Sequence, residues 1–234
     1  MPKGLEPIHK VIISGTGRSG TTFLVRLLTE LGLDTGIVKR NWDRKYYEHC
    51  NAGLEHDLLD PKTPYIVKNP SLCETLPSIL ATGRFVIDHA YIPIRELGEA
   101  TASRVSVGGS NGNVPGGLLR TSDPGQQRAV LAEMFHGIVH TLVAHEIPVT
   151  FILFPRMVQD ADYTRRSLAF LLDGIAPADF LGAFERVADP SLVHSFGDGS
   201  AKIERAEWPR RRRGRMSGLQ ASLMGLLGLK KGRP

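Results

Sequence analysis

The amino-acid sequence predicts a three-layer α/β fold, in which helices cover both faces of a mostly parallel sheet. Short runs of apolar and β-branched residues recur along the chain, and segments with helical periodicity lie between them. When strands alternate with helices in this way, each helix crosses over the sheet and the strands that it connects run parallel. The chain has 234 residues, 41% of them hydrophobic, which is enough for one such domain with a buried core.

The first strand, loop and helix follow from residues 10–32. Residues 10–14, Lys-Val-Ile-Ile-Ser, form a β-branched run that predicts a strand. A glycine-rich loop follows at residues 15–22. Beyond it, apolar residues are spaced as one face of a helix, which Gly32 ends. These apolar residues are Phe23, Leu24, Leu27, Leu28 and Leu31.

Three further strands are predicted at residues 64–68, within residues 84–94, and at residues 149–154. Each is apolar enough that we expect both of its faces to be buried. The clearest helix covers residues 126–146, where apolar residues repeat with the helical period. They are Val130, Leu131, Met134, Phe135, Ile138, Val139, Leu142 and Val143. Residues 107–125, rich in Gly, Asn, Ser and Pro, form a long connection, and such loops are either functional or merely mobile.

The net charge of +5 is unevenly distributed. Residues 202–234 contain ten of the 29 Lys and Arg residues but two of the 24 Asp and Glu residues, so this segment carries +8 and the rest of the chain −3. We therefore predict one α/β domain at residues 1–201 and a basic tail at residues 202–234, either flexible or docked. Such a tail can attract an anionic ligand or touch a membrane surface, although a solvated chain end is the simpler explanation. We expect no nucleic-acid partner.

The composition also bears on the cellular location. The longest apolar runs, residues 151–154 and 168–172, are far shorter than the roughly 20 residues that span a bilayer. No apolar leader precedes the first strand. Two cysteines, Cys50 and Cys73, are too few for a disulfide framework and form no metal-ligand pattern. We expect a cytoplasmic protein that binds no metal.

Residues 15–22, Gly-Thr-Gly-Arg-Ser-Gly-Thr-Thr, have the glycine spacing of a phosphate-binding loop, or P-loop. In such a loop the backbone N–H groups converge on phosphate oxygens, and the following helix adds a partial positive charge. The form found in nucleotide triphosphatases ends in Gly-Lys-Ser/Thr, but Thr21 stands at the lysine position here. The cation is instead Arg18, inside the loop. The predicted phosphate contacts are Gly17, Arg18, Ser19, Gly20, Thr21 and Thr22.

A basic residue followed by Ser-Gly-Thr-Thr resembles the 5′-phosphosulfate loop of the sulfotransferase family, whose sulfuryl donor is 3′-phosphoadenosine 5′-phosphosulfate (PAPS). In that family an arginine at a strand end and a serine eight residues later hold the 3′-phosphate of the donor, and Arg95 and Ser103 have this spacing. The alternative is that Arg95 pairs with Glu96 or Glu99 at the surface. The resemblance extends over residues 10–185.

The same resemblance suggests catalytic residues. Lys68 matches a lysine that supports the transferring sulfuryl group. Pro70 stands where cytosolic members carry a catalytic histidine, so the base must lie elsewhere. Other branches use a glutamate beyond the loop, which makes Glu48 the first candidate and His49 the second. Residues 212–214, Arg-Arg-Gly, could imitate a late segment that grips the 3′-phosphate.

The resemblance implies metal-free, in-line transfer of a sulfuryl group from PAPS to a hydroxyl or amine of a glycan or small molecule, with Arg18, Lys68 and Glu48 as the catalytic residues. Residues 41–59, the stretch after Lys68 and residues 107–125 would build the acceptor pocket. Two alternatives stay open. One is a P-loop kinase or other NTP-dependent enzyme, for which Asp88 is the best candidate for the metal-binding carboxylate. The other is a relative that binds PAPS without turnover.

Overall fold

The structure is a computed structural model, and it describes residues 6–38, 46–47, 52–60, 62–108 and 114–193. These residues belong to one compact unit, Met1–Gly199. A second unit, Ser200–Pro234, lies wholly outside the described residues, and so does the predicted basic tail. Among the described residues, no helix has the length and apolar character needed to cross a bilayer.

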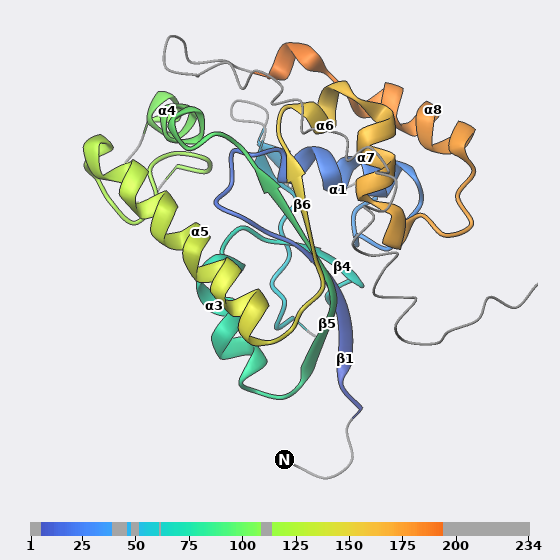
Figure 1. The fold of residues 1–234 in the computed structure, drawn as a ribbon, viewed down its shortest axis with the longest axis horizontal. Helices are drawn as coiled ribbons and strands as arrows, with labels where there is room; N and C mark the ends of the chain where they lie inside the picture. The colour runs from blue at the N-terminus through green and yellow to red at the C-terminus, as the bar shows by residue number, and fades with distance from the viewer. Residues whose placement is uncertain (1–5, 39–45, 48–51, 61, 109–113, 194–234) are drawn as a thin grey trace, which may run out of the picture. The chain divides into compact units, whose positions relative to one another are not determined.

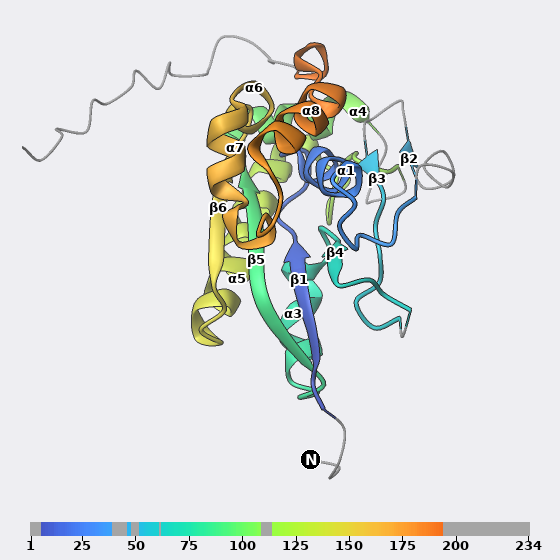
Figure 2. The ribbon, with the colours of Figure 1, turned by 90° about the vertical axis from the view of Figure 1, so that its right-hand side faces the viewer.

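A four-stranded parallel sheet in the order β4-β1-β5-β6 forms the centre of the unit (Figure 2). β1 (Ile8–Ile13) lies between β4 (Ile66–Lys68) and β5 (Phe85–Ile94), and β6 (Val149–Leu153) pairs with the other side of β5. A separate antiparallel pair joins β2 (Tyr46–Tyr47) and β3 (Ala52–Gly53). All four strands predicted from the apolar runs are therefore confirmed.

Helices pack on both faces of this sheet (Figure 1). One face is covered by α1 (Thr21–Glu30), α6 (Arg156–Gln159), α7 (Ala161–Ser167) and α8 (Pro177–Val187). The other is covered by α3 (Leu72–Leu80) and α5 (Gln127–Ala144), with α4 (Leu97–Val107) against α5. Three short 3₁₀ helices complete the described part: η3 (Pro124–Gln126), η4 (Ala169–Leu171) and η5 (Pro190–Leu192).

Alternate residues of β1 point to opposite faces of the sheet, as the pleat of a strand requires. Val11 and Ile13 join the hydrophobic cluster under α1, whereas Ile12 joins the cluster under α3 and α5. All three side chains are fully buried. The predicted α/β architecture, a mostly parallel sheet between two layers of helices, is therefore confirmed.

Three details of the predicted burial are wrong. On β5, Val86 is 39% exposed. β6 is an edge strand, and Phe151 and Leu153 are each 42% exposed, because the helices on that face do not reach over the outer side of the sheet. On α5, Val143 is 71% exposed. The buried face of this helix instead ends with Thr141 and Leu142, because the helix meets the sheet along a narrower stripe than its apolar residues suggest.

The first turn of α4 is capped by a carboxylate. Glu96 precedes the helix, and its side chain accepts a hydrogen bond from the backbone N–H of Glu99 at 2.7 Å. Hydrogen bonds from the N–H groups of Gly98 and Glu99 lower the pKa of the Glu96 carboxyl. A carboxyl with a lowered pKa stabilises the fold above its unfolded-state pKa, and this contribution is lost as the pH falls through the folded-state value.

We therefore expect Glu96→Gln to lower the free energy of unfolding at pH 7 by no more than about 1 kcal/mol, because the cap is charge-assisted but solvent-exposed. The difference between variant and wild type should shrink as the pH falls below the ordinary glutamate pKa of 4.5, and it should vanish only below the lowered pKa of the folded protein, where the wild-type carboxyl is protonated too. Urea denaturation at several pH values measures this. Glu133→Gln, at an exposed position on α5, is the control and should show no such pH dependence.

Candidate functional site

The glycine loop, residues 15–22, joins β1 to α1 at the carboxyl edge of the sheet, where ligands of open α/β sheets bind. Within the described part of the chain, the backbone N–H groups of Gly17, Ser19, Gly20, Thr21 and Thr22 donate to no carbonyl oxygen. Left-handed backbone conformations turn these groups outward. They occur at Gly15 (φ 131°), Gly17 (φ 70°), Arg18 (φ 58°) and Gly20 (φ 88°). The loop thus offers several unused donors at a helix N-terminus, which is the usual form of an anion site.

Arginine side chains hold the loop from the side of β5 and α4. Arg95 Nη1 donates to the carbonyl oxygen of Arg18 at 3.2 Å, and Arg104 Nη2 donates to that of Thr16 at 2.5 Å. Arg18 in turn donates from Nε to the hydroxyl of Ser103 at 3.0 Å. Because two loop carbonyls are engaged by guanidinium groups, the loop is fixed with its carbonyls toward the protein and a positive charge close behind it.

Arg95 and Ser103 both lie beside Arg18, but in different surroundings. Arg95 also pairs with Glu99, with 3.1 Å between Nη2 and Oε2, and burial lowers the pKa of its guanidinium. The alternative interpretation of Arg95, an ion pair with Glu99, is thus present. It is not a surface pair, because the side chains of Arg95 and Glu99 are only 8% and 14% exposed. Ser103 is fully buried. The joint role of this pair in holding a phosphate remains a prediction.

Lys68 lies at the end of β4, level with the last residue of β1, since the register pairs Ile13 with Lys68. Its side chain is 2% exposed. Nζ donates to the carbonyl oxygen of Gly53 and to Oε1 of Glu55, both at 2.8 Å. The parallel sheet therefore brings the predicted lysine to the edge that also carries the glycine loop, and it adds a carboxylate that the sequence analysis did not identify.

A cavity of about 360 Å³, here called the Lys68 cavity, separates the glycine loop from Lys68 and Glu55. Arg104 contributes to the same cavity, together with Ser71 and Glu74 from the start of α3. The remaining wall is apolar. It consists of Ala52, Gly53, Pro70, Val114, Pro115, Gly116, Gly117, Leu118, Leu119 and Met134.

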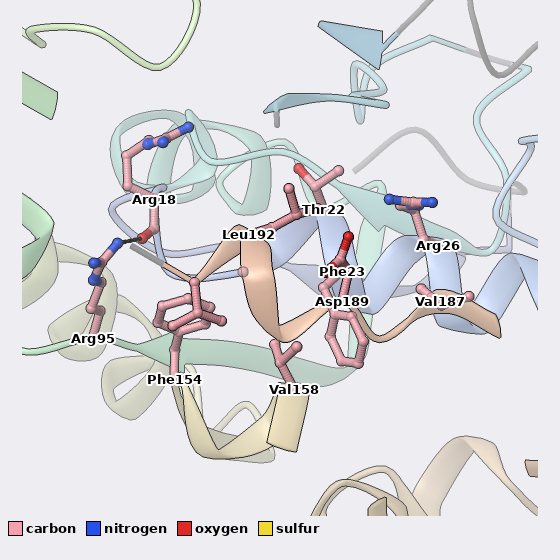
Figure 3. A pocket seen from close by; sticks show the side chains of 12 residues that line it. Arg18, Thr22, Phe23, Arg26, Arg95, Phe154, Val158, Val187, Asp189 and Leu192 are labelled. Atoms are coloured by element: carbon pink, nitrogen blue, oxygen red, sulfur yellow. Dashed lines mark hydrogen bonds between the residues drawn. The ribbon is translucent and has the colours of Figure 1, made fainter. Parts of the chain in front are cut away.

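A second cavity, of about 100 Å³ and here called the Phe23 pocket, lies on the other side of the loop (Figure 3). Arg18 and Arg95 stand at one end and Arg26 at the other (Figure 3). Between them the lining is mainly apolar, and it includes Asp189. The other lining residues are Gly20, Thr22, Phe23, Phe154, Val158, Val187, Leu192 and Val193. Arg18, Gly20 and Thr22 line both cavities, so the loop is accessible from two sides.

Several predicted residues do not take part in this arrangement. Glu48, His49 and residues 212–214 lie outside the described residues. Asp88 lies within β5, not at its carboxyl end, and its oxygens bind His9 Nδ1 at 2.6 Å and the hydroxyl of Tyr65 at 2.8 Å. Since β5 continues to Ile94 before the edge that carries the loop, Asp88 is not placed to hold a metal ion beside a bound nucleotide.

Four residues of the site were missed from the sequence. Arg104 and Glu55 carry no local signal, because their roles depend on contacts with distant backbone and side chains. Phe23 and Arg26 do carry a local signal in the sequence, because they lie on the first turns of α1, directly after the glycine loop. Among the described residues, no group of three or more His, Cys, Asp or Glu side chains is arranged to hold a metal ion.

No family model matches the sequence, and no curated protein matches it either. Among solved structures, the fold is similar to the sulfotransferase domain of the Synechococcus PCC 7002 olefin synthase, with a TM-score of 0.46 and 14% sequence identity. The match covers 99% of this chain and 98% of that chain. At this level of similarity it carries no weight for individual residues, whose roles rest on the geometry described above.

Proposed function

We propose that the protein is a sulfotransferase that moves a sulfuryl group from PAPS to a hydroxyl group. The observation that carries the proposal is the position of the glycine loop between two cavities that share Arg18, Gly20 and Thr22. The Phe23 pocket, with its aromatic rings and Arg95 but a volume of about 100 Å³, suits one part of the donor's adenosine, and the Lys68 cavity suits the acceptor. Group transfer requires the donor and the acceptor to meet at one point, and the loop is that point because it lines both cavities.

In the proposed reaction the acceptor oxygen attacks the sulfur atom in line with the bridging oxygen of the donor. The new S–O bond forms as the bond between sulfur and the 5′-phosphate oxygen breaks, and adenosine 3′,5′-bisphosphate leaves with the bonding electrons. The loop N–H groups and Arg18 offset the charge that grows on the 5′-phosphate, and Lys68 offsets charge near the bridging oxygen. The proton of the acceptor hydroxyl passes to a base.

Two carboxylates are candidates for that base. Glu48 stays a prediction, because it lies outside the described residues. Glu55 faces the Lys68 cavity, is held by Lys68, and has a side chain 47% exposed, so an acceptor can approach it. A sulfuryl-transfer assay on Glu48→Gln and Glu55→Gln shows which glutamate is the base. The variant that lacks the base should transfer the sulfuryl group about 10²- to 10⁴-fold more slowly than the wild type.

The described lining of the Lys68 cavity combines an apolar wall with polar and charged groups. The wall offers contact surface, and Ser71, Glu55 and Glu74 offer hydrogen-bond partners for a hydroxyl group. We therefore propose as acceptor a hydroxyl group on a small molecule or sugar that has both apolar and polar surface.

Calorimetric titration tests the donor assignment. The proposal requires adenosine 3′,5′-bisphosphate to bind more tightly than ATP with Mg²⁺, whereas an NTP-dependent enzyme would show the reverse order. Release of labelled sulfate from PAPS, with a panel of small-molecule alcohols and phenols, then separates an enzyme from a relative that binds PAPS without turnover.

For Arg95→Ala we expect affinity for adenosine 3′,5′-bisphosphate to fall by roughly 10- to 150-fold, the worth of one charge-assisted hydrogen bond. Because Arg95 also supports the carbonyl of Arg18, adenosine 5′-monophosphate provides the matched ligand. A loss confined to the bisphosphate indicates a 3′-phosphate contact. Equal losses for both ligands would instead show that Arg95 only supports the loop. Arg84→Ala, at an exposed arginine just before β5, is the control.

A further inference from the structure

Arg104 joins two segments of the site. It lies on α4, directly after Ser103, and is 5% exposed. One guanidinium nitrogen, Nη2, donates to the carbonyl oxygen of Thr16 in the glycine loop at 2.5 Å. The other, Nη1, donates to the carbonyl oxygen of Gly117 at 2.6 Å. A single rigid, planar group therefore fixes the distance between the loop and the segment that contains Gly117.

The second segment, residues 114–119, forms part of the apolar wall of the Lys68 cavity and is here called the cavity wall. Among its described contacts, it is also held by the hydrogen bond from Leu119 N–H to Oε1 of Gln127 at 2.7 Å, by one from Gly117 N–H to the carbonyl oxygen of Val114 at 3.0 Å, and by the burial of Leu118. Gly116 has a φ of 80°. With two successive glycines, this backbone has little intrinsic preference for one conformation, so its order depends on such contacts.

The charge of Arg104 is only partly compensated. Among the described residues, both of its hydrogen bonds go to neutral carbonyl groups, and Nε is buried without a partner. Burial, followed by the repulsion of Arg18, lowers the pKa of the guanidinium to about 10, and the attraction of Glu55 offsets only part of this, so the group stays protonated at neutral pH. A buried charge of this kind is costly until an anion compensates it. The glycine loop, to which Arg104 donates its 2.5 Å hydrogen bond, is the anion site of the proposed function.

We propose that Arg104 is a positioning residue that couples the presence of an anion on the glycine loop to the order of the cavity wall. An anion on the loop adds counter-charge and strengthens both hydrogen bonds of the guanidinium, so the wall becomes more ordered when the donor is bound. Coupling of this kind is reciprocal, and an ordered wall also favours the anion. Donor binding therefore prepares the acceptor cavity, and acceptor should bind after donor. This inference rests on the proposed function only in that the loop binds an anion.

Hydrogen exchange of the full chain tests the coupling, with adenosine 3′,5′-bisphosphate and inorganic pyrophosphate as probes. In the wild type, saturating probe should slow exchange in the glycine loop and also, by about fivefold or more, in residues 114–119. In Arg104→Met the loop should still be protected, whereas the protection of residues 114–119 should be lost. Arg104→Lys keeps the charge and should restore part of it. Arg120→Met, which breaks the exposed pair with Glu74 next to the wall, is the control and should keep the coupling.

The outcomes separate the inference from the proposed function. If neither probe protects the glycine loop of the wild type, the loop binds no such anion, and both the proposed function and the coupling fail. If the loop is protected but the wall is not, or if Arg104→Met retains the wall's response, the coupling is wrong while the donor site stands. A purely structural role for Arg104 would speed exchange in residues 114–119 equally with and without probe, and that result would also overturn the inference.

Discussion

Replacement of Lys68 by methionine is expected to lower kcat for sulfuryl transfer by about 100- to 1,000-fold, the usual effect of removing one group that stabilises transition-state charge. The affinity for adenosine 3′,5′-bisphosphate should change little, because the lysine lies across the Lys68 cavity from the loop and acts on charge that appears only during transfer. Methionine nearly preserves the volume of this buried side chain, so the fold should be retained.

Transfer to an acceptor found in the alcohol and phenol panel provides the rate, and the slow transfer to water provides a second measure. Lys62→Met, at an exposed lysine in the segment before β4, is the matched control and should leave kcat unchanged. A fall in bisphosphate affinity as large as the fall in kcat would show that Lys68 holds the donor in the ground state. An unchanged kcat would remove Lys68 from the catalytic residues.

Gly20→Ala is expected to lower the free energy of unfolding by about 2–4 kcal/mol, through a left-handed backbone and an overpacked site. Gly20 has a φ of 88°, and a Cβ there would lie 2.1 Å from Cε of Met157 and 2.9 Å from Cδ2 of Phe154. Relief of these clashes would move the start of α1 and the loop N–H groups with it. We therefore expect anion affinity at the loop to fall together with stability.

Gly32→Ala is the matched control for this substitution. Gly32 also has a left-handed backbone, with a φ of 78°, but a Cβ there would meet no atom within 4 Å. Gly32→Ala should lower the free energy of unfolding only by the backbone contribution, about 1 kcal/mol, and leave anion binding unchanged. Urea denaturation gives both free energies, and equal losses in the two variants would contradict the packing argument for Gly20.

The strand, loop and helix around residues 10–32 could be predicted because their signals are local. A β-branched run, closely spaced glycines and a helical apolar period each act over a few residues, and each agrees with the observed element. That Lys68 lies at the same edge of the sheet as the loop was also predictable, because parallel strands bring their carboxyl ends to one edge. The exposure of Phe151 was not, because it depends on β6 being the last strand of the sheet.

The chain's own residue pattern was thus enough to predict the α/β class, which the structure confirms, and the glycine loop with Arg18 inside it, whose phosphate-binding role stays a prediction. Only the folded chain decided which groups meet there: Arg104 with the carbonyls of Thr16 and Gly117, and Lys68 with Glu55. These pairs are 88, 13 and 13 residues apart. Contacts over such separations follow from how helices and strands pack, and no spacing along the sequence specifies them. For the same physical reason, the two cavities on either side of the loop became visible only in the tertiary structure.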